Sequence, residues 1–103
     1  SETEELKTRI ETIRALSGQL RERNRTVKSL EEEMTATAPD MLVLGKKHHY
    51  NLLKAELEDE RRLVLEDKTG LGSLSKDLFE DFNIVADKAT STNSLESMLD
   101  LIE

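Results

Sequence analysis

An apolar residue recurs at every seventh position through the first third of the chain, without interruption. A seven-residue apolar repeat runs along one side of an α-helix and is typical of a coiled coil. Residues 2–36 hold eight large apolar residues, close to two per seven, which is the narrow stripe of a two-stranded seam. The uninterrupted series consists of Leu6, Ile13, Leu20, Val27 and Met34.

We therefore predict that residues 1–36 form a long helix that dimerises as a parallel, two-stranded coiled coil. If the uninterrupted series occupies heptad position d, Asn24 falls at position a. A single buried Asn at a favours two parallel strands in register, because each amide can pair with its twin. The predicted dimer seam comprises Leu6, Ile10, Ile13, Leu16, Leu20, Asn24, Val27, Leu30 and Met34.

The single proline predicts where this first helix ends. Pro39 is incompatible with a helix interior, but it is tolerated in a first turn. Thr37 and Asp40 have the spacing of a capping box and precede an apolar run, so a second helix is expected over residues 37–68. A break this short permits either an antiparallel turn or a kink that keeps the chain direction.

The remaining two-thirds of the chain predict helices with wider apolar stripes. Gly70 is placed to end the second helix as a left-handed cap, and Ser75 can begin a third. Residues 69–103 then form an acidic third segment, with a possible break near residues 89–94. The predicted core of these C-terminal helices comprises Val43, Tyr50, Leu53, Leu57, Val64, Leu78, Phe82, Val85 and Leu99.

The fold class that these patterns predict is all-α, with the coiled-coil helix followed by a helical hairpin or bundle. The alternative is a monomeric three-helix bundle similar to a spectrin repeat, in which the turn at Pro39 is antiparallel. The helix count and the length of 103 residues suit this alternative, whereas the narrow stripe of the first helix and the lack of tryptophan favour the dimer.

Charge and composition narrow the classes of partner. The chain has 22 acidic and 15 basic residues, and residues 69–103 hold seven acids against two lysines. This end repels phosphate backbones, so we expect no nucleic-acid binding, and it suits a protein partner with a basic surface. No apolar run approaches the roughly 20 residues that span a bilayer, so membrane insertion is not expected.

The sequence contains no recognisable catalytic or metal-binding pattern. Cysteine is absent, which removes disulfides and thiolate sites. His48 and His49 are adjacent, so on a helix they point about 100° apart and cannot chelate one ion together. We expect no enzyme activity, no cofactor and no small-molecule substrate.

One short motif is a candidate docking site for another protein. The stretch EDFNIV, residues 80–85, resembles the peptides recognised by ubiquitin-like autophagy modifiers, with an aromatic and an aliphatic anchor after acids. The other interpretation places both anchors in a helix core, three residues apart. The candidate docking residues are Glu80, Asp81, Phe82 and Val85.

The function that these patterns predict is a non-catalytic dimerisation and protein-interaction module of a longer scaffold, adaptor or tether, of a kind found in cytoskeletal and membrane-trafficking proteins. The alternatives are a monomeric spacer of a cytoskeletal protein and a regulatory-subunit fragment completed by another protein. The chain begins with Ser1 and ends within an apolar pattern, so we expect a piece of a longer protein, with Ser1 a candidate cloning remnant. The expected location is the cytoplasm, or the nucleus.

Overall fold

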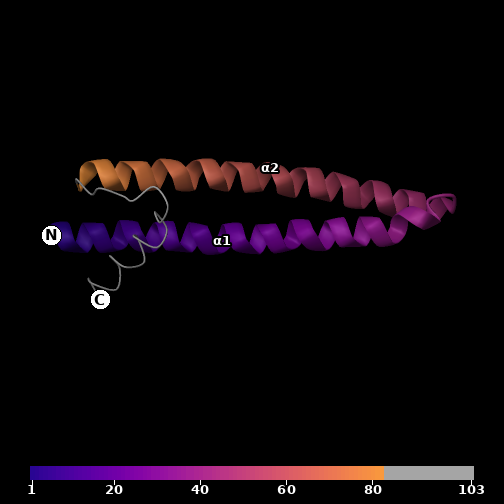
Figure 1. Ribbon diagram of the computed structural model, residues 1–103, viewed down its shortest axis with the longest axis horizontal. Coiled ribbons are helices and arrows are strands. Elements are labelled where there is room, and N and C mark those ends of the chain that lie inside the picture. The colour runs from indigo at the N-terminus through magenta and orange to yellow at the C-terminus, as the bar shows by residue number, and fades with distance from the viewer. Residues whose placement is uncertain (83–103) are drawn as a thin grey trace. The chain divides into compact units, whose positions relative to one another are not determined.

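The computed structural model describes residues 1–82 and contains two long helices joined by a short turn (Figure 1). Helix α1 spans Glu2–Thr37, the 3₁₀ helix η1 spans Ala38–Asp40, and helix α2 spans Leu44–Asp81. No strand occurs within residues 1–82. The predicted all-α class is therefore confirmed.

Helix α1 begins with a side-chain cap. The backbone N–H of Glu4 donates to the Ser1 hydroxyl oxygen at 3.4 Å, and the N-terminal ammonium contacts the Glu4 carboxylate at 3.5 Å. Glu2, Glu4 and Glu5 all lie in the first turn, where negative charge offsets the positive end of the helix dipole. These features stabilise the first turn of α1.

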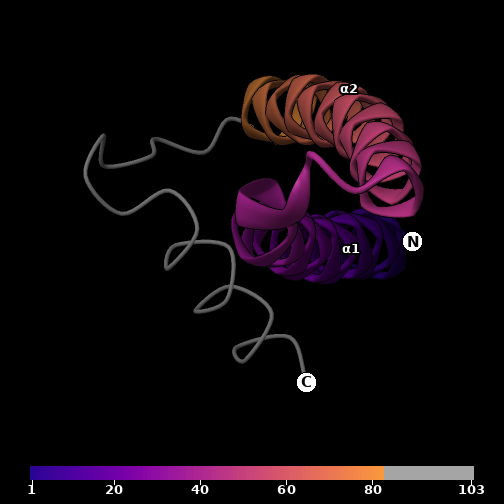
Figure 2. The same cartoon turned by 90° about the vertical axis from the view of Figure 1, so that its right-hand side faces the viewer.

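The segment around Pro39 reverses the chain direction (Figure 2). Pro39 lies in the first turn of η1, as its fixed φ allows, but the Thr37 side chain forms no capping hydrogen bond. The Met41 N–H then donates to the Ala38 carbonyl at 3.3 Å, and the Val43 N–H donates to the Asp40 carbonyl at 3.0 Å. Helix α2 consequently starts at Leu44, seven residues later than the predicted start at residue 37.

Helix α2 continues where the sequence predicts a helix end. It runs without a break through Gly70, Gly72 and Ser75 to Asp81. The backbone of Gly70 does not adopt the left-handed conformation of a cap, and a Cβ at this position would lie 3.7 Å from Leu16 Cδ2. Packing of an apolar face stabilises a helix more than local propensity does, which explains why the glycines do not end α2.

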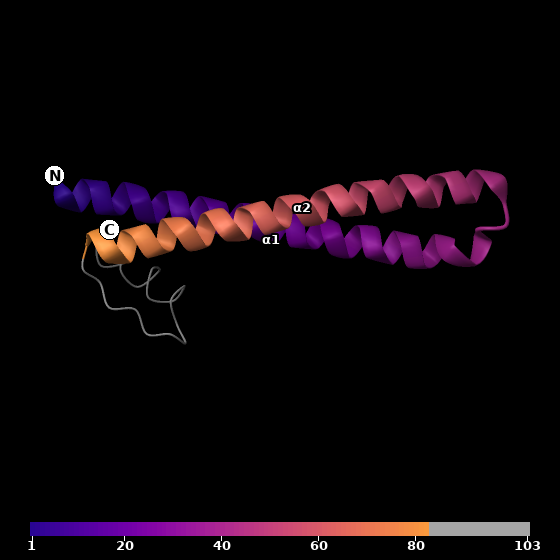
Figure 3. The same ribbon diagram turned by 90° about the horizontal axis from the view of Figure 1, so that it is seen from above.

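The chain divides into two compact units, each of which contains a part of both helices. The first unit combines residues 1–18 with the chain from residue 69 onward, and the second comprises residues 19–68. Within the second unit, the end of α1 and the start of α2 pack antiparallel (Figures 1 and 3). Within the first unit, the start of α1 packs on the end of α2, also antiparallel.

Each unit has a small apolar core between its two helix segments. In the first unit Ile10, Ile13 and Leu78 are buried together, and Leu78 has no exposed surface. In the second unit Leu30, Leu53 and Leu57 form the buried cluster. The half-buried apolar residues that flank the two clusters are Leu6, Leu71, Phe79 and Phe82 in the first unit, and Val27 and Met34 in the second.

The packed side of α1 follows a different heptad frame from the predicted one. The uninterrupted apolar series lies on this side, but its companion row lies three residues after each member and not three before. The predicted frame puts the residues three before each member at position a, and three of these, Thr3, Asn24 and Glu31, are exposed. The row found in the structure is buried or half-buried throughout and consists of Arg9, Leu16, Arg23, Leu30 and Thr37.

Candidate functional site

Three charged side chains meet between the helix segments of the second unit. The Arg23 guanidinium donates from Nε to Asp67 Oδ2 at 2.7 Å and from Nη1 to Glu60 Oε1 at 3.4 Å. Gln19 donates from Nε2 to the same Asp67 oxygen at 3.1 Å. The Arg23 side chain is 24% exposed, whereas those of Glu60 and Asp67 are 19% and 12% exposed. Among the ion pairs within residues 1–82, those of this cluster have the least exposed side chains.

The electrostatics of this cluster favour a permanently charged arginine. The hydrogen bond that Arg23 donates to Asp67 raises the pKa of Arg23, and partial desolvation lowers it. The attraction of both carboxylates leaves the pKa of Arg23 above its ordinary value. A guanidinium carries five N–H donors in a rigid plane, so it can serve two carboxylates at once. The cluster therefore pairs one α1 position with two α2 positions seven residues apart, and it fixes how these segments align.

A second ion pair joins the helix segments of the first unit. Arg9 Nη1 lies 2.9 Å from Asp81 Oδ2 and 3.9 Å from Glu5 Oε1. The same guanidinium lies over the Phe82 ring, 5.4 Å from the ring centre, in a cation–π arrangement. Arg9 thus contacts Asp81, the last residue of α2, and Phe82, which follows it.

This arrangement bears directly on the candidate docking motif. Asp81 is paired with Arg9, and Phe82 packs against the buried cluster of the first unit, as the core interpretation of the motif expects. Glu80 is exposed and lies 4.0 Å from Lys76 Nζ. Val85 lies outside the described residues. Docking of this motif on a partner stays a prediction, and it would require Phe82 to leave its own unit.

The apolar residues of the predicted dimer seam pack against α2 of the same chain and not against a second copy of α1. Ile10, Ile13 and Leu30 are buried, and Asn24 is exposed, in contrast to the buried position that the predicted frame assigns to it. The other seam residues are half-buried: Leu6, Leu16, Leu20, Val27 and Met34. Intrachain packing accounts for the burial of every one of these apolar residues.

The predicted C-terminal core is present in part. Leu53, Leu57, Val64 and Leu78 are buried, and Tyr50 and Phe82 are half-buried. Val43 is 59% exposed, because it lies in the turn before α2 begins and not on a helix face. Val85 and Leu99 lie outside the described residues.

Sequence reasoning missed the Arg23 cluster and the exposed turn. The signal for the cluster is a shared spacing, since Leu53, Glu60 and Asp67 recur every seven residues on the packed side of α2. Charged residues in an apolar row require opposite charges on the facing helix, and Arg9 and Arg23 occupy the matching row of α1. The exposed turn was missed because its consecutive apolar residues were interpreted as the start of a buried helix. These residues are Leu42, Val43 and Leu44, and they are 103%, 59% and 84% exposed.

Residues 1–82 contain no group of three His, Asp or Glu placed to hold a metal ion, and His48 and His49 are both exposed. Every buried side-chain nitrogen or oxygen in this range has a hydrogen-bond partner. A shallow depression on α1 is lined by residues of that helix alone: Lys28, Glu31, Glu32, Thr35 and Ala36. Neither α1 nor α2 is long and apolar enough to cross a membrane.

The sequence matches no protein-family model, and no curated protein or solved structure is similar to it.

Proposed function

We propose that this chain is a non-catalytic protein-interaction module of a longer scaffold, adaptor or tether protein, and that it works in the cytoplasm as a homodimer. The observation that carries the proposal is that the apolar side of α1 packs against α2 of the same chain. An antiparallel pair of this kind has completed its own seam, so its outer surfaces are what it offers to a partner.

The apolar core within residues 1–82 is small, which supports association of this helix pair with further helices. Within residues 1–82, seven apolar side chains are buried, in two separate clusters of three and at Val64. A core of this size rarely stabilises a small domain by itself, and oligomerisation is one common remedy. Half-buried residues such as Phe79 and Met34 flank the clusters, where another helix could cover them.

The dimer that we propose differs from the parallel seam in which α1 pairs with a second α1. Such a seam would need the apolar row of α1 to leave α2, and Arg23 would lose both of its carboxylate partners. Breaking partly buried ion pairs without replacement is unfavourable. We therefore propose that two antiparallel helix pairs associate through their outer surfaces.

Sedimentation equilibrium combined with one cysteine substitution tests this proposal. We expect the chain to have the mass of a dimer. We also expect Leu20→Cys to form little disulfide across that dimer, since Leu20 is half-buried within one chain. An efficient link between two Leu20→Cys positions requires parallel strands in register, because the α-carbons of a disulfide lie about 4.4–6.8 Å apart. That result would contradict our arrangement and support the parallel seam. A monomeric mass would rule out the proposed dimer.

A monomeric spacer is the second candidate, and the antiparallel turn at Pro39 favours it. In a three-helix spacer the apolar residues of residues 83–103, which lie outside the described part, would cover the flanks of the two clusters. A monomer that loses much of its stability when residues 83–103 are deleted would support the spacer. A dimer whose stability depends on protein concentration would support the interaction module.

A further inference from the structure

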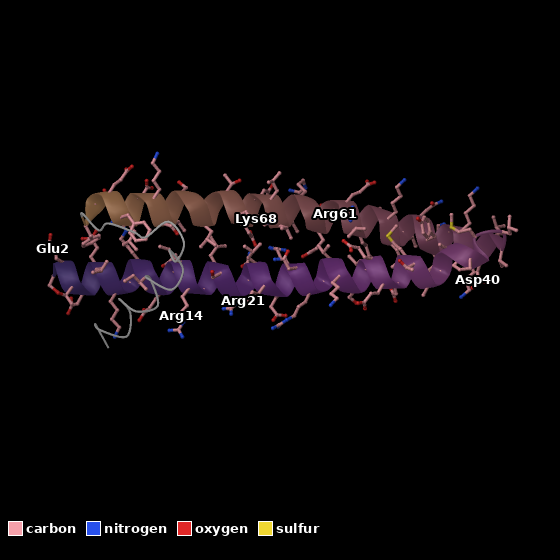
Figure 4. The ribbon with its side chains drawn as sticks, in the orientation of Figure 1. Glu2, Arg14, Arg21, Asp40, Arg61 and Lys68 are labelled. Atoms are coloured by element: carbon pink, nitrogen blue, oxygen red, sulfur yellow. The ribbon has the colours of Figure 1, made fainter. Side chains whose placement is uncertain are left out.

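The turn between α1 and α2 and the first residue of α2 carry the two most exposed large apolar side chains of the described residues, Leu42 and Leu44. Leu42 is 103% exposed, Leu44 84% and Val43 59%, and these three are consecutive in the chain. Met41 beside them is half-buried. A cluster of large apolar side chains that projects from a turn into water is a feature of interaction sites. We call residues 41–47 the tip; Figure 4 labels Asp40, which immediately precedes it.

The charges next to these apolar residues are basic in a chain that is acidic overall. Residues 41–55 form the longest stretch without Asp or Glu, and they hold three lysines and two histidines, against a net charge of −7 for the chain. Lys46 and Lys47 lie in the first turn of α2 and are exposed. Within residues 1–82, neither ammonium lies within ion-pair distance of a carboxylate.

We propose that the tip docks on the surface of an anionic lipid bilayer. Leu42, Val43 and Leu44 would enter the boundary between headgroups and acyl chains, and Lys46 and Lys47 would contact the negatively charged headgroups. This combination of apolar side chains with flanking lysines is how helices and loops bind at a membrane surface without crossing it. The helices themselves would stay in water, in agreement with the absence of a spanning helix from residues 1–82.

The shape of the tip favours a lipid surface over an acidic protein. A protein partner that accepts apolar side chains usually offers them a pocket and satisfies nearby polar groups, whereas a bilayer accepts any projecting apolar group of suitable length. The shallow depression on α1 is lined by Lys28, Glu31, Glu32, Thr35 and Ala36, so no residue of the tip contributes to it. Binding through an acidic protein instead would appear in the test below as a failure to bind vesicles.

Nearby acids set the expected strength of binding. Asp40 lies beside the tip, and Glu32 and Glu33 lie about one helical turn before the end of α1. These carboxylates are within about one Debye length, roughly 8 Å, of the turn, so they oppose an anionic surface. Glu31 forms an ion pair with Arg61 at 3.1 Å, so its charge repels an anionic surface less than an unpaired carboxylate would. One tip should therefore bind weakly and reversibly, and two tips in a dimer more tightly.

Vesicle co-sedimentation of the full chain tests the proposal. We expect binding to phosphatidylcholine vesicles that contain phosphatidylserine, little binding to pure phosphatidylcholine, and a fall in binding as salt rises. Lys46→Glu combined with Lys47→Glu should weaken binding roughly tenfold or more, and Leu42→Ser should weaken it severalfold. Asp40→Asn should strengthen binding, because it removes the carboxylate nearest to the headgroups.

Two matched substitutions away from the tip serve as controls. Lys68→Glu reverses an exposed lysine about 36 Å along α2 from Leu44, and Leu65→Ser removes an exposed leucine about 30 Å from Leu44. Both should bind vesicles within about twofold of the unchanged chain. Circular dichroism should show the same helix content for every variant, since all of these positions are exposed. Equal binding to both kinds of vesicle, no binding to either, or equal losses in the controls and the tip variants would each overturn the proposal.

Discussion

Arg23 occupies a position where the seven-residue pattern of α1 calls for an apolar side chain. Its neighbours in the same row include Leu16 and Leu30, which pack against α2. A charged group in this row is stable because Asp67 and Glu60 face it, at 2.7 and 3.4 Å. Other alignments of the second unit would leave these carboxylates facing apolar side chains, which is costly. The cluster therefore selects one alignment among several that apolar packing alone would tolerate.

We predict that Arg23→Ala lowers the melting temperature of the chain by a few degrees. The substitution leaves Asp67 and Glu60 close together and without their shared cation, so repulsion adds to the loss of two hydrogen bonds. Thermal unfolding followed by circular dichroism measures the effect. Arg14→Ala is the control, because Arg14 is exposed and projects away from α2 (Figure 4). Equal melting temperatures for the two variants would show that the cluster does not contribute to stability.

Leu78 is the most completely buried side chain among the described residues of the first unit, and its truncation should be costly. It has no exposed surface and contacts Ile10 and Ile13 across the helix pair. We predict that Leu78→Ala lowers the free energy of unfolding by about 2–5 kcal/mol, through lost burial and the cavity that remains. Leu74→Ala, four residues earlier and 38% exposed, should cost less than about 1 kcal/mol. Urea unfolding curves for both variants would contradict the assigned core if the two losses were equal.

At the scale of the elements, the sequence predicted which residues are helical better than where each helix ends. The apolar repeat indicated α1, and Pro39 marked its end to within one residue of Thr37. The end predicted at Gly70 was wrong, because glycine permits a left-handed cap but does not impose one when the helix on both sides is packed. The start predicted at residue 37 was early, because four consecutive apolar residues looked like a helix face and not a turn.

The continuity of α2 predicts that its glycines can be replaced with a gain in stability. Gly70→Ala would place a methyl group 3.7 Å from Leu16 Cδ2, an ordinary contact, and Gly72→Ala would meet nothing within 4 Å. Each substitution should raise the free energy of unfolding by roughly 0.5–1 kcal/mol, because alanine favours the helix and loses less entropy on folding. Urea unfolding measures the gain. Destabilisation by Gly70→Ala would instead indicate a left-handed cap and two separate helices.

For the whole chain, composition and periodicity were sufficient for the all-α class but not for the partner of each helix. A narrow seven-residue seam can be completed by a second copy or by another segment of the same chain, and the apolar residues look alike in both cases. The choice depends on charged residues such as Arg9 and Arg23, whose opposite charges lie far away in sequence. The exposed tip was also missed, because the same apolar residue types occur in exposed interaction sites and in buried cores.

The alignment set by Arg23 restricts how such a protein can change in length over evolution. One residue inserted into α1 between Arg23 and the turn would rotate the preceding residues by about 100° and turn Arg23 away from Asp67. Seven residues would restore the rotation but shift the segment by about 10 Å along α2, unless seven were also inserted between the turn and Glu60. Homologous chains that keep the cluster should therefore differ in this region by matched insertions of about two turns on both sides of Pro39, which would lengthen the helix pair and leave its turn intact.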